Sequence, residues 1–140
     1  MMKTQSERRW LRSLFAILAG FIVVVLAHVG TDALMHATGI FPPWGQPMSD
    51  GLFALATAYR SGWSILGSYI TARLAPFNPM AHALAGACIG IVLSVAGTIA
   101  TWNRGPEFGP HWYPIALIIL ALPCAWLGGK LQAKTSGKTA

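Results

Sequence analysis

The chain has 140 residues, of which 54% are hydrophobic and only 10% are charged. Soluble domains carry about 25% charged residues, so this composition excludes an ordinary water-facing domain. The formal net charge of +6 comes from basic residues that lie mainly near the two ends of the chain. This split argues against a nucleic-acid-binding protein and favours contact with anionic lipid headgroups.

Long apolar runs account for most of the chain. They cover residues 13–35, 51–72, 79–101 and 112–129. About 20 apolar residues in a helix cross the hydrocarbon core of a membrane. Only helices and closed barrels satisfy their backbone in lipid, and these runs are too long and continuous for barrel strands. We therefore expect an all-α polytopic membrane protein, a single domain with four transmembrane helices in an up-down bundle.

The first run follows a basic segment, as in a secretory signal peptide. Its apolar stretch is longer than the 7–15 residues of a signal-peptide core, and no small-x-small cleavage site precedes the polar loop. We expect this run to be retained as a helix.

The basic residues predict the orientation of the bundle. The predicted tails cover residues 1–12 and 130–140, and the predicted outer loops cover residues 37–50 and 102–111. Arg104 is the only Lys or Arg residue in the two predicted outer loops, whereas Arg73 lies between the second and third runs. By the positive-inside rule, both termini face the cytoplasm of a bacterial-type inner membrane. The basic residues of the tails are Lys3, Arg8, Arg9, Arg12, Lys130, Lys134 and Lys138.

Ionisable residues interrupt the first two runs. His28, Asp32 and His36 are spaced four residues apart, which places them on one face of a helix. Arg60 lies deep in the second run, where an arginine costs about 2.5–3.5 kcal/mol and normally has a partner. Asp32 is the only acidic residue near that depth. We therefore predict an Asp32–Arg60 ion pair between the first two helices, with His28 beside it.

Three interpretations of this polar cluster remain open. The groups can hold the helices together through polar contacts, or they can act as a proton or ion relay. They can also contribute to a divalent metal site, in which His28 or His36 joins Asp32 and either His111 or Glu107 completes the ligand set. The nearby arginine would compete with a cation. The first expectation is therefore no cofactor, and a divalent metal is the alternative.

Small residues predict where helices approach closely. Gly86, Gly90 and Ser94 are spaced at four-residue steps in the third run, and Ala58 and Gly62 share this spacing in the second. Small residues let helix backbones come together in lipid. We expect the second and third helices to pack tightly through these faces.

Pro123 lies inside the fourth run and predicts a kink, because proline cannot donate the helical hydrogen bond. A separate feature is a weak likeness between the two halves of the chain. "LGSYITAR" (66–73) resembles "LGGKLQAK" (127–134), and "LAG" occurs at 18–20 and 84–86. The halves are then either two parallel hairpin repeats or similar by chance.

No phosphate-binding, dinucleotide-binding or zinc-protease motif occurs in the sequence, so an enzyme is not expected. The pattern favours a small integral membrane protein with a structural or partner-binding role. The partner would be a second copy or another membrane protein, and the Pro-rich loop 37–50 is a candidate docking surface. The alternative is a small proton- or ion-coupled transporter, or a transporter subunit, that uses His28, Asp32 and Arg60.

Overall fold

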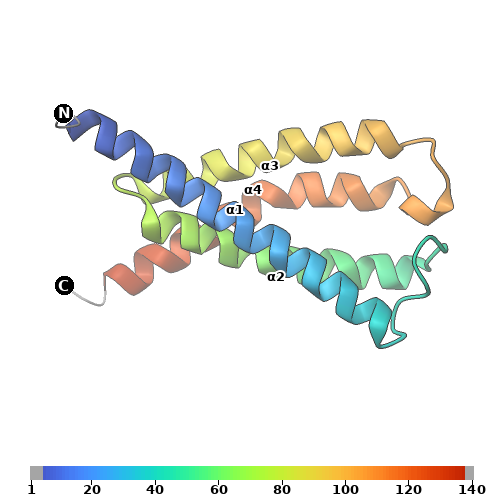
Figure 1. The fold of residues 1–140 in the computed structure, drawn as a ribbon. Helices are drawn as coiled ribbons and strands as arrows, with labels where there is room; N and C mark the ends of the chain where they lie inside the picture. The colour runs from blue at the N-terminus through green and yellow to red at the C-terminus, as the bar shows by residue number, and fades with distance from the viewer. Residues whose placement is uncertain (1–4, 138–140) are drawn as a thin grey trace.

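The computed structural model describes residues 5–137, and these form an all-α fold, as predicted. The helices are α1 (Gln5–Ala37), α2 (Asp50–Leu74), α3 (Pro79–Thr101), the short 3-10 helix η1 (Pro106–Phe108) and α4 (Trp112–Ser136). The four long helices alternate in direction, so that both chain ends lie at one end of the bundle (Figure 1). This is called the terminal end below. The opposite end, which carries loops 38–49 and 102–111, is called the loop end.

The outer helices are longer than the apolar runs that predict them. α1 begins at Gln5, within the basic tail, and α4 continues to Ser136. Arginine, lysine, glutamine and leucine are good helix formers, so the helices continue past the apolar segments. The described basic residues of both tails therefore lie on helix ends at the terminal end, as does Arg73. Lys3 and Lys138 lie outside the described residues.

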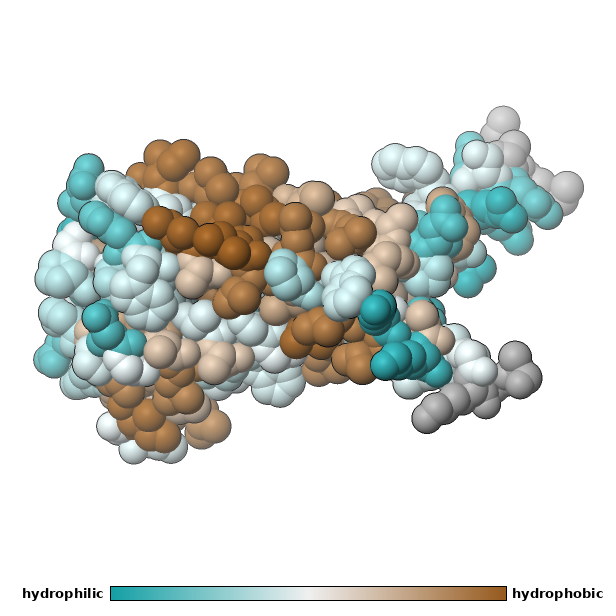
Figure 2. All heavy atoms as spheres, turned by 180° about the vertical axis from the view of Figure 1, so that it is seen from behind, coloured by the Kyte–Doolittle hydropathy of each residue, from teal (hydrophilic) through white to brown (hydrophobic). Residues whose placement is uncertain are grey.

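Three of the helices are long and apolar enough to cross a membrane: α1, α3, and α4 taken with η1. The large apolar side chains of these helices are mostly exposed, and none among the described residues is fully buried. Figure 2 shows them as a hydrophobic middle between two more hydrophilic ends. Such a surface needs lipid or another protein to cover it.

Helix α2 is the one described long helix without a stretch apolar enough for a membrane span, and it lies at the centre of the contacts. It packs most extensively against α4 and α1, and it also contacts α3. Helix α1 crosses α2 diagonally and touches α3 only lightly (Figure 1). The polar residues of α2, among them Arg60 and Ser64, are half-buried among the other helices. The other helices therefore cover part of the surface of α2.

Two glycines allow α1 and α2 to cross at close range. A Cβ added to Gly20 would meet the Thr71 side chain and would lie 2.5 Å from the carbonyl oxygen of Gly67. A Cβ on Gly67 would meet Val24 and would lie 2.9 Å from the carbonyl oxygen of Gly20. Both glycines are buried, so this crossing depends on the absence of side chains.

Two adjacent glycines of α4 likewise allow close approach to neighbouring helices. A Cβ on Gly128 would lie 2.5 Å from the carbonyl oxygen of Ile65 in α2. A Cβ on Gly129 would lie 2.7 Å from the Met80 sulfur in α3. The first contact is with rigid backbone, and the second is with the flexible end of a side chain.

The small residues that were expected to join α2 and α3 do not form the close contact. A Cβ on Gly90 or Gly62 would meet no atom within 4 Å, and one on Gly86 would reach only Ile17 of α1, at 4.0 Å. Ala58, Gly62 and Ser94 are exposed. The predicted close packing fails because α3 is rotated so that Gly86, Gly90 and Ser94 line a cleft instead of packing directly against α2. These three residues are called the small-residue face of α3 below.

Pro123 lies on an exposed side of α4, and the helix continues through it to Ser136. Proline inside a helix leaves one backbone carbonyl without its usual donor. The kink at this residue remains a prediction.

Candidate functional site

The candidate site begins with an ion pair between α1 and α2. The Arg60 guanidinium donates from Nη2 to Asp32 Oδ2, and the Tyr59 hydroxyl donates to Asp32 Oδ1. The Asp32 side chain is 18% exposed and the Arg60 side chain 25% exposed. Both carboxylate oxygens of Asp32 are therefore occupied by donors from α2.

Two further hydrogen bonds extend this contact along the helices. His28 Nε2 donates to the main-chain carbonyl of Arg60 over 3.1 Å. The Trp63 indole donates to the Thr31 hydroxyl over 2.9 Å. The α1–α2 contact thus has a polar part toward the loop end and a glycine crossing toward the terminal end. The sequence did not indicate the Trp63–Thr31 bond, because neither residue is ionisable or unusual in a membrane helix.

His36 belongs to the same face of α1 but has a different environment. Its Nδ1 donates to the carbonyl oxygen of Pro42 over 2.5 Å. The His36 ring lies 3.6 Å from the Trp44 ring centroid and 5.4 Å from that of Phe41, which is buried. His36 therefore fastens loop 38–49 to the end of α1 and lies outside the ion-pair network.

Loop 102–111 is also held by a histidine that bonds to a main-chain carbonyl and contacts a tryptophan ring. His111 Nε2 donates to the carbonyl of Trp102 over 3.0 Å, and the two rings stack with centroids 4.0 Å apart. Glu107 lies exposed on η1, with its carboxylate over Gly105. Each loop at the loop end is thus held by a histidine in ring contact with a tryptophan, stacked for His111 and Trp102 and tilted for His36 and Trp44.

The residues considered as metal ligands are consequently not brought together. Asp32 is held by Arg60 and Tyr59, His28 by the Arg60 carbonyl, and His36 and His111 by their separate loops. Within residues 5–137, no group of three or more His, Cys, Asp or Glu side chains is placed to hold a metal ion. Helix spacing alone could not reveal this, because it does not determine where the loops place His111 and Glu107.

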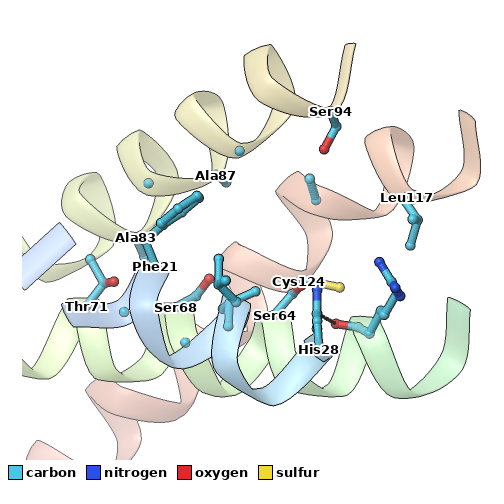
Figure 3. Close-up of a pocket in the computed structure, with 18 of the residues that line it drawn as sticks. Phe21, His28, Ser64, Ser68, Thr71, Ala83, Ala87, Ser94, Leu117 and Cys124 are labelled. Atoms are coloured by element: carbon cyan, nitrogen blue, oxygen red, sulfur yellow. Dashed lines mark hydrogen bonds between the residues drawn. The ribbon is translucent and has the colours of Figure 1, made fainter. Parts of the chain in front are cut away.

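A cleft of about 270 Å³ adjoins the ion pair. All four long helices line it, and His28 lies toward one end (Figure 3). Arg60, whose carbonyl accepts from His28, also lines the cleft. Its walls are mainly apolar and include Phe21, Leu93 and Leu117. The small-residue face of α3 forms one wall. No residue pattern indicated this cleft directly, and it arises from the diagonal course of α1 (Figure 1).

Hydroxyl groups line the α2 side of the cleft. Ser64, Ser68 and Thr71 lie along α2, and Ser94 lies on the α3 wall (Figure 3). Within the described part of the chain, the hydroxyls of Ser64 and Ser68 make no hydrogen bond, and the buried Arg60 Nε also has no partner. The cleft is therefore mainly apolar, and most of its hydrogen-bond donors lie on α2.

Comparisons with protein-family models, curated proteins and solved structures find no match for this chain.

Proposed function

We propose that this protein is a small integral component of a bacterial-type inner membrane with a structural or partner-binding role. In this proposal α2 is the fourth transmembrane helix, and both termini face the cytoplasm. The gathering of Arg8, Arg9, Arg12, Arg73, Lys130 and Lys134 at the terminal end supports this orientation. The same basic end would contact anionic headgroups.

The observation that carries the proposed role is the pairing of the polar groups inside the apolar region. Asp32 accepts from Arg60 and Tyr59, and His28 donates to a main-chain carbonyl. A relay or ion site needs a carboxylate that can exchange its partner for a proton or cation. Here the carboxylate is bound on both oxygens, which favours a role in joining α1 to α2.

The fastened loops provide surfaces to which a partner can bind. Trp44 is 68% exposed and Ile40 49% exposed, although His36 and Phe41 anchor the loop beneath them. Exposed aromatic residues on a rigid support are common centres of protein–protein contact. A membrane protein or a second copy of this chain is the proposed partner.

A small proton- or ion-coupled transporter is the second candidate. The observation that favours it is the cleft beside His28 and Arg60, because ionisable groups in transport proteins usually face such a cavity.

Asp32→Asn distinguishes these two roles. In a structural role, the substitution lowers the unfolding temperature of the detergent-solubilised protein and leaves proton or cation flux in proteoliposomes unchanged. Loss of flux with an unchanged unfolding temperature would instead establish transport. Asp50→Asn is the control, because Asp50 is exposed at the start of α2 and accepts only one long bond, of 3.3 Å, from Trp112. Reporter fusions at both termini test the orientation separately.

A further inference from the structure

The lining residues Phe21 and Val25 of α1 and Leu93 of α3 are exposed, so the cleft is open between these two helices. Ile17 faces Gly86, and the helices diverge toward the loop end (Figure 1). At the closed end, Gly20 and Thr71 are in contact. If the helices span the membrane as proposed above, the opening between α1 and α3 faces the hydrocarbon core. A ligand would then enter from the lipid and not from water.

The size of the cleft limits what can occupy it. Arg60 and Thr71, which mark its two ends on α2, are eleven residues apart, or about 16 Å along a helix. The volume of about 270 Å³ is close to the lower limit of small-molecule pockets. A small ring or chain therefore fits inside.

The polar groups determine the chemistry of the ligand. Ser64 and Ser68 are hydrogen-bond donors without a partner in the described residues, and no carboxylate is among the lining residues. Asp32 already balances the charge of Arg60. The complementary ligand is therefore uncharged and carries hydrogen-bond acceptors.

The depth and spacing of Ser64 and Ser68 further restrict the chemical class of the ligand. Ser64 lies about 15 Å or more from both ends of α2, beyond the reach of phospholipid esters and phosphates at the membrane surface. Ser64 and Ser68 are separated by about 6 Å along the helix and lie on one face. Serine hydroxyls rotate, so the two can turn toward acceptors on opposite sides of one six-membered ring.

We propose that the cleft binds a lipid-soluble quinone. The two ring carbonyls accept hydrogen bonds from the Ser64 and Ser68 hydroxyls, and the ring lies between Phe21 and the small-residue face of α3. The apolar tail leaves between α1 and α3. The proposal concerns binding alone and depends on the membrane placement proposed above, but not on the role of the ion pair.

The test is isothermal titration of the detergent-solubilised protein with a decyl-tailed benzoquinone. Gly90→Leu fills the open space on the cleft wall and is expected to weaken binding at least tenfold. Gly97→Leu is the matched control, because it lies two turns further along α3, also in open space, and does not line the cleft. It is expected to change the affinity less than twofold.

A second variant tests the donors without changing the shape of the cleft. Ser64→Ala/Ser68→Ala removes two hydrogen bonds and is expected to weaken binding by about 25-fold, or about fivefold for each bond. Absence of saturable binding to the unaltered protein would overturn the proposal. Equal affinities of the two leucine variants, or displacement of the quinone by equimolar phosphatidylglycerol, would also overturn it. None of these outcomes affects the Asp32→Asn result, so a failure here is distinct from a failure of the proposed role.

Discussion

The two helical hairpins of this protein are joined in different ways. The α1–α2 hairpin contains an ion pair, three further hydrogen bonds and the Gly20–Gly67 crossing. In the α3–α4 hairpin, the apolar runs 79–101 and 112–129 contain no Asp, Glu, Lys or Arg. There, Gly129 of α4 lies against the Met80 side chain of α3.

The difference follows from the neighbours of each helix. Helix α4 packs against both α2 and α3, whereas α1 has α2 as its main neighbour. In lipid, apolar side chains gain little by leaving lipid for protein, so a peripheral helix needs directional bonds or close backbone contact. The polar groups are thus concentrated at α1, which has few contacts with helices other than α2.

The largest effect is expected when one partner of the ion pair is removed. Asp32→Ala leaves the Arg60 charge without a counterion and should lower the free energy of unfolding by about 3 kcal/mol. Asp32→Ala/Arg60→Leu removes both charges and should recover most of this loss. Circular dichroism during denaturation in mixed micelles measures both values. A double variant as unstable as the single one would show that the charges do not act as a pair.

The same substitution in each hairpin should have unequal effects. Gly20→Ala places a Cβ against Thr71 and the Gly67 carbonyl, and should lower the free energy of unfolding by about 2 kcal/mol. Gly129→Ala meets only the movable end of Met80 and should cost less than about 0.5 kcal/mol. The same denaturation assay compares them. Similar losses would mean that α3 and α4 are joined as tightly by backbone contact as α1 and α2.

The smallest effect is expected from a single neutral bond. Trp63→Phe removes the donor to Thr31 and should cost about 0.6 kcal/mol, the average for interhelical hydrogen bonds in lipid. Trp126→Phe is the control, since Trp126 is exposed on α4 and contacts Lys130 through its ring face. If the two variants are equally stable, the Trp63–Thr31 bond contributes nothing to the α1–α2 contact.

The sequence is sufficient to predict the helices and the main polar contact. Lipid requires long apolar helices, so composition and run length identify them. Counting residues along the first two runs places Asp32 and Arg60 at similar depths, and the low tolerance of lipid for an unpaired arginine indicates their pairing. The polarity of α2 was visible as well, because Arg60 interrupts its run.

Helix rotation and the paths of the loops could not be predicted in this way. Gly86 and Gly90 have the spacing of a packing motif, but the same spacing suits the wall of a cleft. Gly20 and Gly67 make the close crossing, and the only sign of it was that each lies in a segment with a counterpart in the other half of the chain. The ring contacts of His36 with Trp44 and of His111 with Trp102 depend on loop conformation, which hydropathy does not describe.

The central position of α2 has a consequence for biosynthesis. Among the long helices, it alone falls short of the apolarity needed to enter a bilayer unaided. Its arginine follows the aspartate of α1 by 28 residues, so α1 leaves the ribosome first and presents the counterion before Arg60 arrives. If α2 spans the membrane as proposed, α1 and α2 would enter the bilayer as a pair, and a ribosome-bound chain truncated after α2 should fail to insert its second helix when Asp32 is replaced by alanine.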